Sequence, residues 1–245
     1  MSVDERMVHD IVQKVMANMQ ISGSVSGMHG VFKDMNDAIN ASIEAQKKVC
    51  TMTLDQREQI ISLIRKKTHE NAEILANMGV NETGMGNVGD KILKHHLTAD
   101  KVPGTEDIST IAWSGDRGLT LVEMGPFGVI GAITPATNPS ETVICNCIGM
   151  LAGGNTVVFN PHPNAKKTTI YTINMINEAS IEAGGPDNIA VTVEAPTLDT
   201  SAIMMKHPSI HLLVATGGPG VVTAVLSSGK RAIGAGAGNP PVLVD

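Results

Sequence analysis

The sequence predicts an α/β protein with a doubly wound, mostly parallel, Rossmann-like sheet that follows an N-terminal helical region. Its 245 residues, 42% of them hydrophobic, are enough to build a sizeable core. After about residue 119, short β-rich runs alternate with helical segments, which is typical of parallel strands joined by right-handed crossovers. The predicted strands are 119–124, 128–133, 156–159, 189–193, 211–215 and 242–244, and the predicted helices lie near 139–152, 165–183, 199–206 and 219–228.

The first 31 residues predict a helix on a tether. Residues 1–20 place apolar side chains at helical spacing, which indicates an amphipathic helix, and residues 21–31 are rich in Gly and Ser, as flexible linkers are. The main domain is predicted over 32–245. Two interpretations of the helix stay open: it docks on its own domain, or it binds a groove on a partner protein.

Helices are expected to dominate from about residue 32 to 98. Asp55 and Glu58 have capping-box spacing before an apolar helix face. Residues 84–89 match the G-x-G-x-x-G pattern, but a helix precedes them where a phosphate-binding loop needs a strand. We therefore expect a turn between two helices there.

Composition excludes several functions. A net charge of −6 and only 2% aromatic residues argue against nucleic acid or an anionic membrane as partner. The three cysteines form neither a disulfide framework nor a zinc pattern, so no metal site is predicted and a reducing, cytoplasmic setting is expected. We find neither a signal peptide nor an apolar run of membrane-spanning length.

Asn138 stands at a predicted junction between strand and helix. The β-branched run 129–133 ends at Thr134-Pro135, and Pro139 suits the first turn of a helix. An amide held there can donate a hydrogen bond to negative charge that develops in a cleft, and the helix N-terminus adds to the positive field.

Two further loops are candidates for ligand contact. Residues 216–220 (Thr-Gly-Gly-Pro-Gly) join a buried-type strand to a helix, and their glycines let an anion or cofactor approach the backbone. Residues 160–163 (Asn-Pro-His-Pro) follow the carboxyl end of another strand, where doubly wound sheets bind ligands. An ordinary connecting loop and a rigid proline turn are the alternatives.

These motifs resemble the cofactor half of the aldehyde dehydrogenase superfamily. The Thr-Asn-Pro and Asn-Pro-His-Pro variants resemble its coenzyme-A-acylating branch, the enzymes of ethanolamine and propanediol utilisation. The resemblance implies NAD-dependent oxidation of acetaldehyde or propionaldehyde to its acyl-CoA, with coenzyme A as co-substrate and Asn138 as the oxyanion stabiliser. It implies that the cofactor contacts Thr134, Pro135, Ala136, Thr137, Asn160, His162, Pro163, Thr216, Gly217, Gly218, Val221, Ala235 and Gly236.

Three positions depart from the usual family pattern. Ala235 stands where hydrolytic members carry the glutamate that activates water, so a thiol such as coenzyme A is the expected acyl acceptor. Asn160 replaces a lysine that holds the adenosine ribose, and Gly218 replaces a serine. Glu194 is the one candidate for the acidic residue that binds the ribose 2′-hydroxyl of NAD.

The family's nucleophilic cysteine is expected about thirty residues beyond Ala235, so we interpret the chain as an inactive fragment that lacks the catalytic domain. Cys145 and Cys147 are predicted to pack in the core. His95, His96, His207 and His211 are predicted to be surface or packing residues. The resemblance also implies a homo-oligomer when intact, and entry of the N-terminal helix into a bacterial microcompartment through shell or cargo proteins. The alternatives are a hydrolytic aldehyde dehydrogenase and a non-catalytic nucleotide-binding or shell-interacting module.

Overall fold

The computed structural model describes residues 27–236, 238 and 242–243. The predicted helix over residues 1–20 and the first part of the linker lie outside this range. The described helices are α2 (Met35–Val49), α3 (Leu54–Thr83), α4 (Val88–Lys101), α5 (Pro139–Ala152), α6 (Lys166–Glu182), α7 (Leu198–Lys206) and α8 (Pro219–Leu226). The strands are β1 (Val31–Phe32), β2 (Ile111–Gly115), β3 (Gly118–Val122), β4 (Val129–Thr134), β5 (Thr156–Pro161), β6 (Ala190–Val193), β7 (Ile210–Thr216) and β8 (Arg231–Ala235).

Six of these strands form one sheet in the order β1-β6-β5-β4-β7-β8, and every neighbouring pair is parallel. The predicted fold class is therefore confirmed. The chain adds β5 and β6 on one side of β4, and then returns to add β7 and β8 on the other side. The strand order thus reverses at β4, where doubly wound sheets open a ligand crevice at the carboxyl ends of the strands.

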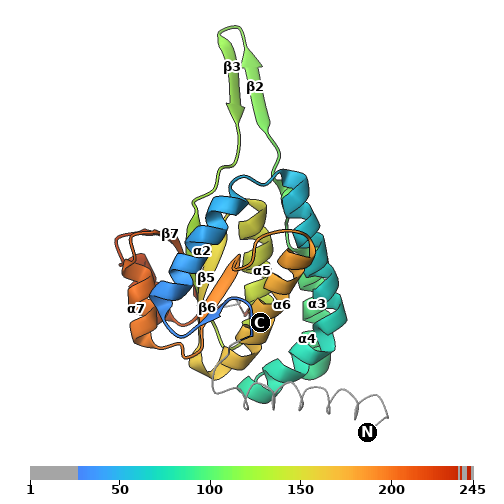
Figure 1. The fold of residues 1–245 in the computed structure, drawn as a ribbon, viewed down its shortest axis with the longest axis vertical. Helices are drawn as coiled ribbons and strands as arrows, with labels where there is room; N and C mark the ends of the chain where they lie inside the picture. Colours follow the sequence, from blue (N-terminus) through green and yellow to red (C-terminus); the bar gives the residue numbers. More distant parts are fainter. Residues whose placement is uncertain (1–26, 237, 239–241, 244–245) are drawn as a thin grey trace.

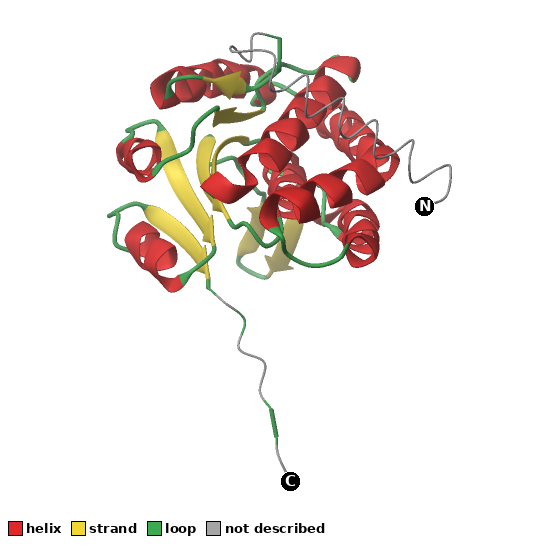
Figure 2. Cartoon of the chain, turned by 90° about the horizontal axis from the view of Figure 1, so that it is seen from below, coloured by secondary structure: helices red, strands yellow, loops and turns green. Residues whose placement is uncertain are grey.

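Helices cover both faces of the sheet (Figures 1 and 2). Helices α3, α5 and α6 build the larger core with residues such as Ile64, Ile144 and Ile176, while α2, α7 and α8 cover the opposite face with Ile39, Met204 and Val225. Along β5, Val157 and Phe159 belong to the first core and Val158 to the second. This alternation follows from the two-residue period of a strand buried on both faces.

The last strand of the sheet differs from the prediction. The sheet ends with β8, which pairs in parallel with β7, and Val242 and Leu243 have no regular secondary structure. A Cβ atom on Gly234 would lie 2.7 Å from Cγ1 of Val222, so a glycine is needed where α8 packs on β8. Residues 231–235 were not predicted as a strand, because Ala and Gly have low β-propensity. The two-residue strand β1 was not predicted either.

The predicted strand 119–124 was placed in the wrong sheet. Its counterpart β3 pairs antiparallel with β2, and the two form a hairpin that projects from the body (Figure 1). Side chains along both strands are exposed, including Trp113, Leu119 and Leu121. β-propensity predicted the strand correctly, but local sequence carries no information about which sheet a strand joins.

The glycine pattern at residues 84–89 forms the predicted turn between helices. Helix α3 ends at Gly84, which adopts the left-handed conformation (φ 68°) that favours glycine, and α4 begins after its N-cap Asn87. The capping box that starts α3 lies two residues earlier than predicted, with Thr53 and Gln56 in place of Asp55 and Glu58. None of the described helices is long and apolar enough to cross a membrane.

Candidate cofactor cleft

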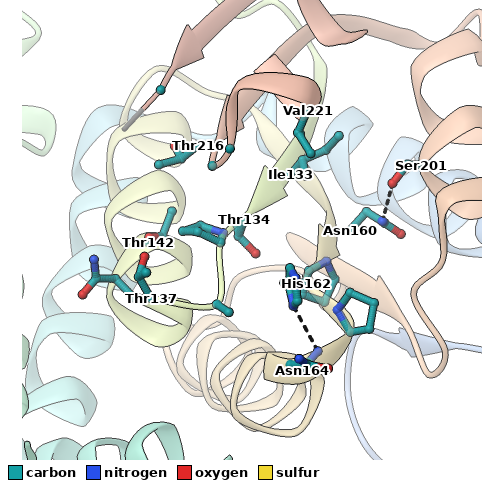
Figure 3. A pocket seen from close by; sticks show the side chains of 18 of the residues that line it. Ile133, Thr134, Thr137, Thr142, Asn160, His162, Asn164, Ser201, Thr216 and Val221 are labelled. Atoms are coloured by element: carbon teal, nitrogen blue, oxygen red, sulfur yellow. Dashed lines mark hydrogen bonds between the residues drawn. The ribbon is translucent and has the colours of Figure 1, made fainter. Parts of the chain in front are cut away.

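A cleft of about 980 Å³ opens at the carboxyl ends of the strands on either side of the point where the strand order reverses. Figure 3 shows side chains from β4, β5, β7 and the loops after them converging on it. Of the predicted site residues, the cleft is lined by Thr134, Pro135, Ala136, Thr137, Asn138, Asn160, His162, Pro163, Thr216, Gly217, Gly218, Val221 and Gly236. Ala235 does not line it, and instead ends β8 immediately before Gly236.

One wall of this cleft was not predicted from the sequence. Thr197 lines it from the β6–α7 connection, Leu198 and Ser201 from α7, and Thr142 from α5. Thr197 also caps α7 through a capping box with Thr200. The signal that could have identified this wall is a capping threonine soon after a buried parallel strand, because such a connection lies at the same edge of the sheet.

The side-chain amide of Asn160 forms hydrogen bonds with residues of α7. Its Nδ2 donates to Oγ of Ser201 at 2.6 Å, and its Oδ1 accepts a hydrogen bond from Oγ1 of Thr200 at 2.7 Å. The side chain is 4% exposed. Asn160 therefore braces the end of β5 against α7, and shapes the cleft wall through these bonds.

His162 and Thr134 both line the cleft but differ in exposure. Nδ1 of His162 accepts from the backbone N–H of Asn164 at 3.2 Å, so the proton of the neutral ring resides on Nε2 (Figure 3). The ring is exposed. Oγ1 of Thr134 is buried and has no hydrogen-bond partner among the described residues. The exposed ring of His162 can therefore bind a polar group of a ligand, whereas Oγ1 of Thr134 lies beneath the cleft surface.

The opposite wall of the cleft consists of backbone. After Thr216, Gly217 and Gly218 lead into α8, and a Cβ atom on either glycine would have no neighbour within 4 Å. Near the start of α8, the N–H groups of Gly217 and Val221 donate to the carbonyl oxygens of Ala235 and Gly218, and Pro219 has no N–H. The helix dipole adds positive potential there. This wall can therefore receive a negatively charged group at close range.

Asn138 lies at the start of α5, as predicted. It is the N-cap residue, Pro139 occupies the first helical position, and the Asn138 side chain makes no capping bond to the helix. Instead, Oδ1 accepts a hydrogen bond from Nζ of Lys94 in α4 at 3.3 Å. The Asn138 amide is therefore held by a neighbouring helix and is not used to cap its own.

A buried polar network joins α4 to the first turn of α5. Nζ of Lys91 donates to Oε1 of Glu141 at 3.2 Å, although these residues are only 3% and 6% exposed. Nδ1 of His95 lies 2.6 Å from the carbonyl oxygen of Lys91, and its Nε2 lies 2.7 Å from Oγ of Ser140. Because a carbonyl only accepts, Nδ1 carries the proton of the neutral ring and Nε2 is its acceptor atom, facing Ser140. Oγ of Ser140 also lies 3.2 Å from Oε2 of Glu141.

His95 is a packing residue, as predicted, but it has specific partners that its position in the sequence did not reveal. Burial lowers its pKa. The charge of Glu141 and the hydrogen bond to the Lys91 carbonyl oppose this effect, and the charges of Lys91 and His96 reinforce it. The folded state therefore holds His95 neutral at pH values where an unfolded chain begins to bind a proton.

We expect this burial to make the protein less stable in mild acid. Above about pH 6.5, His95 is neutral in both folded and unfolded chains. As the pH falls below this value, the unfolded chain takes up a proton that the folded chain refuses, so the free energy of unfolding falls until the folded pKa is reached. Urea unfolding between pH 7.5 and 5 should therefore show a shallower loss for His95→Gln than for the unchanged protein. The same substitution at exposed His211 controls for the loss of one histidine, and equal pH slopes for all three proteins would contradict the expectation.

One of the two cysteine predictions is wrong. Cys147 is buried and burial raises the pKa of its thiol, but Cys145 is exposed on the other side of α5. Two residues span about 200° of helix, so they cannot both face the core. Neither cysteine lines the cleft. Among the other histidines, His96 stacks on His69 at the surface, His207 is half-buried and His211 is exposed.

Comparison with known proteins agrees with this arrangement. Residues 17–244 match the aldehyde dehydrogenase family. The chain belongs to this family. It is 46% identical to an acetaldehyde dehydrogenase (acetylating) of Bilophila wadsworthia over 98% of this chain and 51% of the relative. This confirms the resemblance to the coenzyme-A-acylating branch. The chain spans about half the length of the curated relatives it matches.

Two solved structures share both fold and sequence with the chain. A propionaldehyde dehydrogenase from the Clostridium phytofermentans fucose utilisation bacterial microcompartment is 74% identical, with a TM-score of 0.85 over 87% of this chain and 49% of that one. The propionaldehyde dehydrogenase of Rhodopseudomonas palustris, solved with bound propionyl-CoA, is 50% identical, with a TM-score of 0.84 over 86% of this chain and 47% of that one.

Proposed function

We propose that this chain is the NAD-binding half of a coenzyme-A-acylating aldehyde dehydrogenase, which oxidises acetaldehyde or propionaldehyde to the acyl-CoA. The observation that carries the proposal is the single cleft that brings Asn138 together with an open glycine wall at the start of α8. Its volume of about 980 Å³ suits an elongated cofactor.

The residues present fit a dinucleotide. The backbone wall at Gly217 and Gly218 can receive its diphosphate, because no side chain stands between the backbone and the cleft. The exposed ring of His162 offers a polar atom to its hydroxyl groups or rings. When bound, the cofactor accepts the hydride that the aldehyde loses. Glu194 does not line the cleft, so the preference for NAD over NADP rests on the family resemblance.

In this proposal Asn138 acts on the aldehyde oxygen. Attack of a thiolate on the aldehyde carbon turns the carbonyl oxygen into an alkoxide, and the Nδ2 hydrogens of Asn138 stabilise the new charge. Because Cys145 and Cys147 lie outside the cleft, we assign the nucleophile to a catalytic domain beyond Asp245.

In this proposal Ala235 determines whether the acyl group is hydrolysed or transferred to coenzyme A. Hydrolysis of a thioester needs a general base to activate water, and alanine cannot supply one. The thiol of coenzyme A is intrinsically more nucleophilic and needs less assistance. This absence favours acyl-CoA formation over a hydrolytic aldehyde dehydrogenase.

Product analysis of the intact enzyme tests this assignment. With aldehyde, NAD and coenzyme A we expect one acyl-CoA for each NADH, and little free acid. Ala235→Glu should raise the ratio of acid to acyl-CoA, because a carboxylate can act as the general base that alanine cannot supply. An enzyme that forms mainly acid before any substitution would contradict the assignment, and no turnover in the intact enzyme would favour a non-catalytic nucleotide-binding or shell-interacting module.

We further propose that the intact enzyme is a homo-oligomer that works in the cytoplasm inside a bacterial microcompartment. The microcompartment origin of the 74% identical Clostridium enzyme supports this location. Residues 1–20 would then direct the enzyme to shell or cargo proteins through their apolar helix face.

A further inference from the structure

Helix α4 lies against the loop that carries Asn138, and two of its lysines reach that loop. Nζ of Lys94 lies 3.3 Å from Oδ1 of Asn138. One helical turn earlier, Nζ of Lys91 donates to the carbonyl oxygen of Thr137 at 2.9 Å. The side chain and the backbone at this position are thus each held by an ammonium group from the same helix.

The bond to Lys94 fixes the orientation of the Asn138 amide. An ammonium group has donors and no acceptor, so the amide atom that faces Lys94 must be the oxygen. The Nδ2 hydrogens then point away from Lys94 and can donate to another group. A cation at the amide oxygen also polarises the amide and makes its N–H groups stronger donors.

The bond from Lys91 fixes the backbone on which Asn138 stands. The stem of Lys91 runs past Gly79 and Gly86, since Cβ atoms there would lie 3.8 and 3.5 Å from it. Its ammonium group bridges the Thr137 carbonyl and Glu141, on the two sides of Asn138 in the sequence. The buried pair of His95 and Ser140 holds α4 against the same turn of α5. The loop therefore has little freedom to move relative to α4.

We propose that Lys94 is a positioning residue for the reaction: it holds the Asn138 amide with Nδ2 aimed at the developing oxyanion, on a loop that Lys91 clamps. The proposal rests on the oxyanion role of Asn138 proposed above. Lys94 acts through Asn138 and does not touch the cofactor. Its loss should therefore lower turnover without weakening cofactor binding.

The test replaces Lys94 in the intact enzyme. Lys94→Met keeps the length of the side chain and removes the donor, and we expect kcat to fall roughly tenfold while KM for NAD stays the same. Lys94→Arg keeps a donor and should restore much of kcat. Because Lys94 is exposed, the melting temperature should not change. Lys101→Met, an exposed lysine at the end of the same helix, is the matched control and should leave kcat unchanged.

A double-mutant cycle with Asn138→Ala separates the two proposals. If Lys94 acts through Asn138, adding Lys94→Met to Asn138→Ala should lower kcat little further. An additive loss of kcat in the double variant would overturn the positioning role of Lys94. So would an unchanged kcat for Lys94→Met when Asn138→Ala alone is strongly impaired. Both results leave the role of Asn138 intact. An unchanged kcat for Asn138→Ala would overturn the oxyanion role and the positioning role together.

Discussion

Replacing Asn138 with alanine is expected to lower kcat of the intact enzyme by about 10²–10³. The lost amide acts on charge that develops in the transition state, so the loss should appear in kcat, with cofactor affinity nearly unchanged. Steady-state kinetics at saturating coenzyme A, together with a titration of NAD binding, measures the two effects separately.

A second asparagine in the same cleft provides the control. Asn164 also lines the cleft, but it follows β5 on the side of His162 and is exposed. Asn164→Ala should alter KM for NAD more than kcat. If Asn138→Ala keeps full turnover, or if both substitutions lower kcat equally, the amide of Asn138 is not a specific stabiliser of the oxyanion.

Local sequence predicted the edge of the sheet at which the cleft lies. The strands now seen as β4, β5 and β7 are short runs rich in β-branched residues that end at Thr134, Pro161 and Thr216, and each is followed by a proline or glycine turn. Because parallel strands present their carboxyl ends at one edge, loops far apart in the sequence could be assigned to a single site.

The buried network could not be predicted in the same way. This network joins residues about fifty positions apart in the sequence, namely Lys91, His95, Ser140 and Glu141. Lysine and histidine side chains in a helix ordinarily indicate a face exposed to solvent. Only the packing of α4 on α5 makes these residues partners. The exposed position of Cys145 follows from the same cause, since the rotation of α5 is set by its contacts.

The edge strand β8 and the separate β2–β3 hairpin were not predicted, because strand pairing depends on tertiary structure. Arg231–Ala235 has two small residues and a glycine, and it becomes a strand because β7 offers an unpaired edge. β3 has stronger β-propensity, yet it pairs with β2 outside the main sheet.

The central claim is that the cleft beside α8 binds the nicotinamide cofactor, and a steric block at Gly218 tests it most directly. The backbone of Gly218 is extended (φ −67°, ψ 160°), which any residue can adopt, and a Cβ atom there would meet nothing within 4 Å. The Gly218→Leu enzyme should therefore fold normally, and the leucine side chain should occupy the part of the cleft next to the glycine wall.

Calorimetric titration of the intact enzyme with NAD is the measurement. We predict that Gly218→Leu weakens binding by roughly a hundredfold or more, a loss of about 2.7 kcal/mol. Gly220→Leu is the matched control, because Gly220 lies in the same first turn of α8 with equal free space but does not line the cleft. It should bind NAD as the unchanged enzyme does. Unaltered NAD affinity in a folded Gly218→Leu enzyme would contradict the assignment of this cleft as the cofactor site.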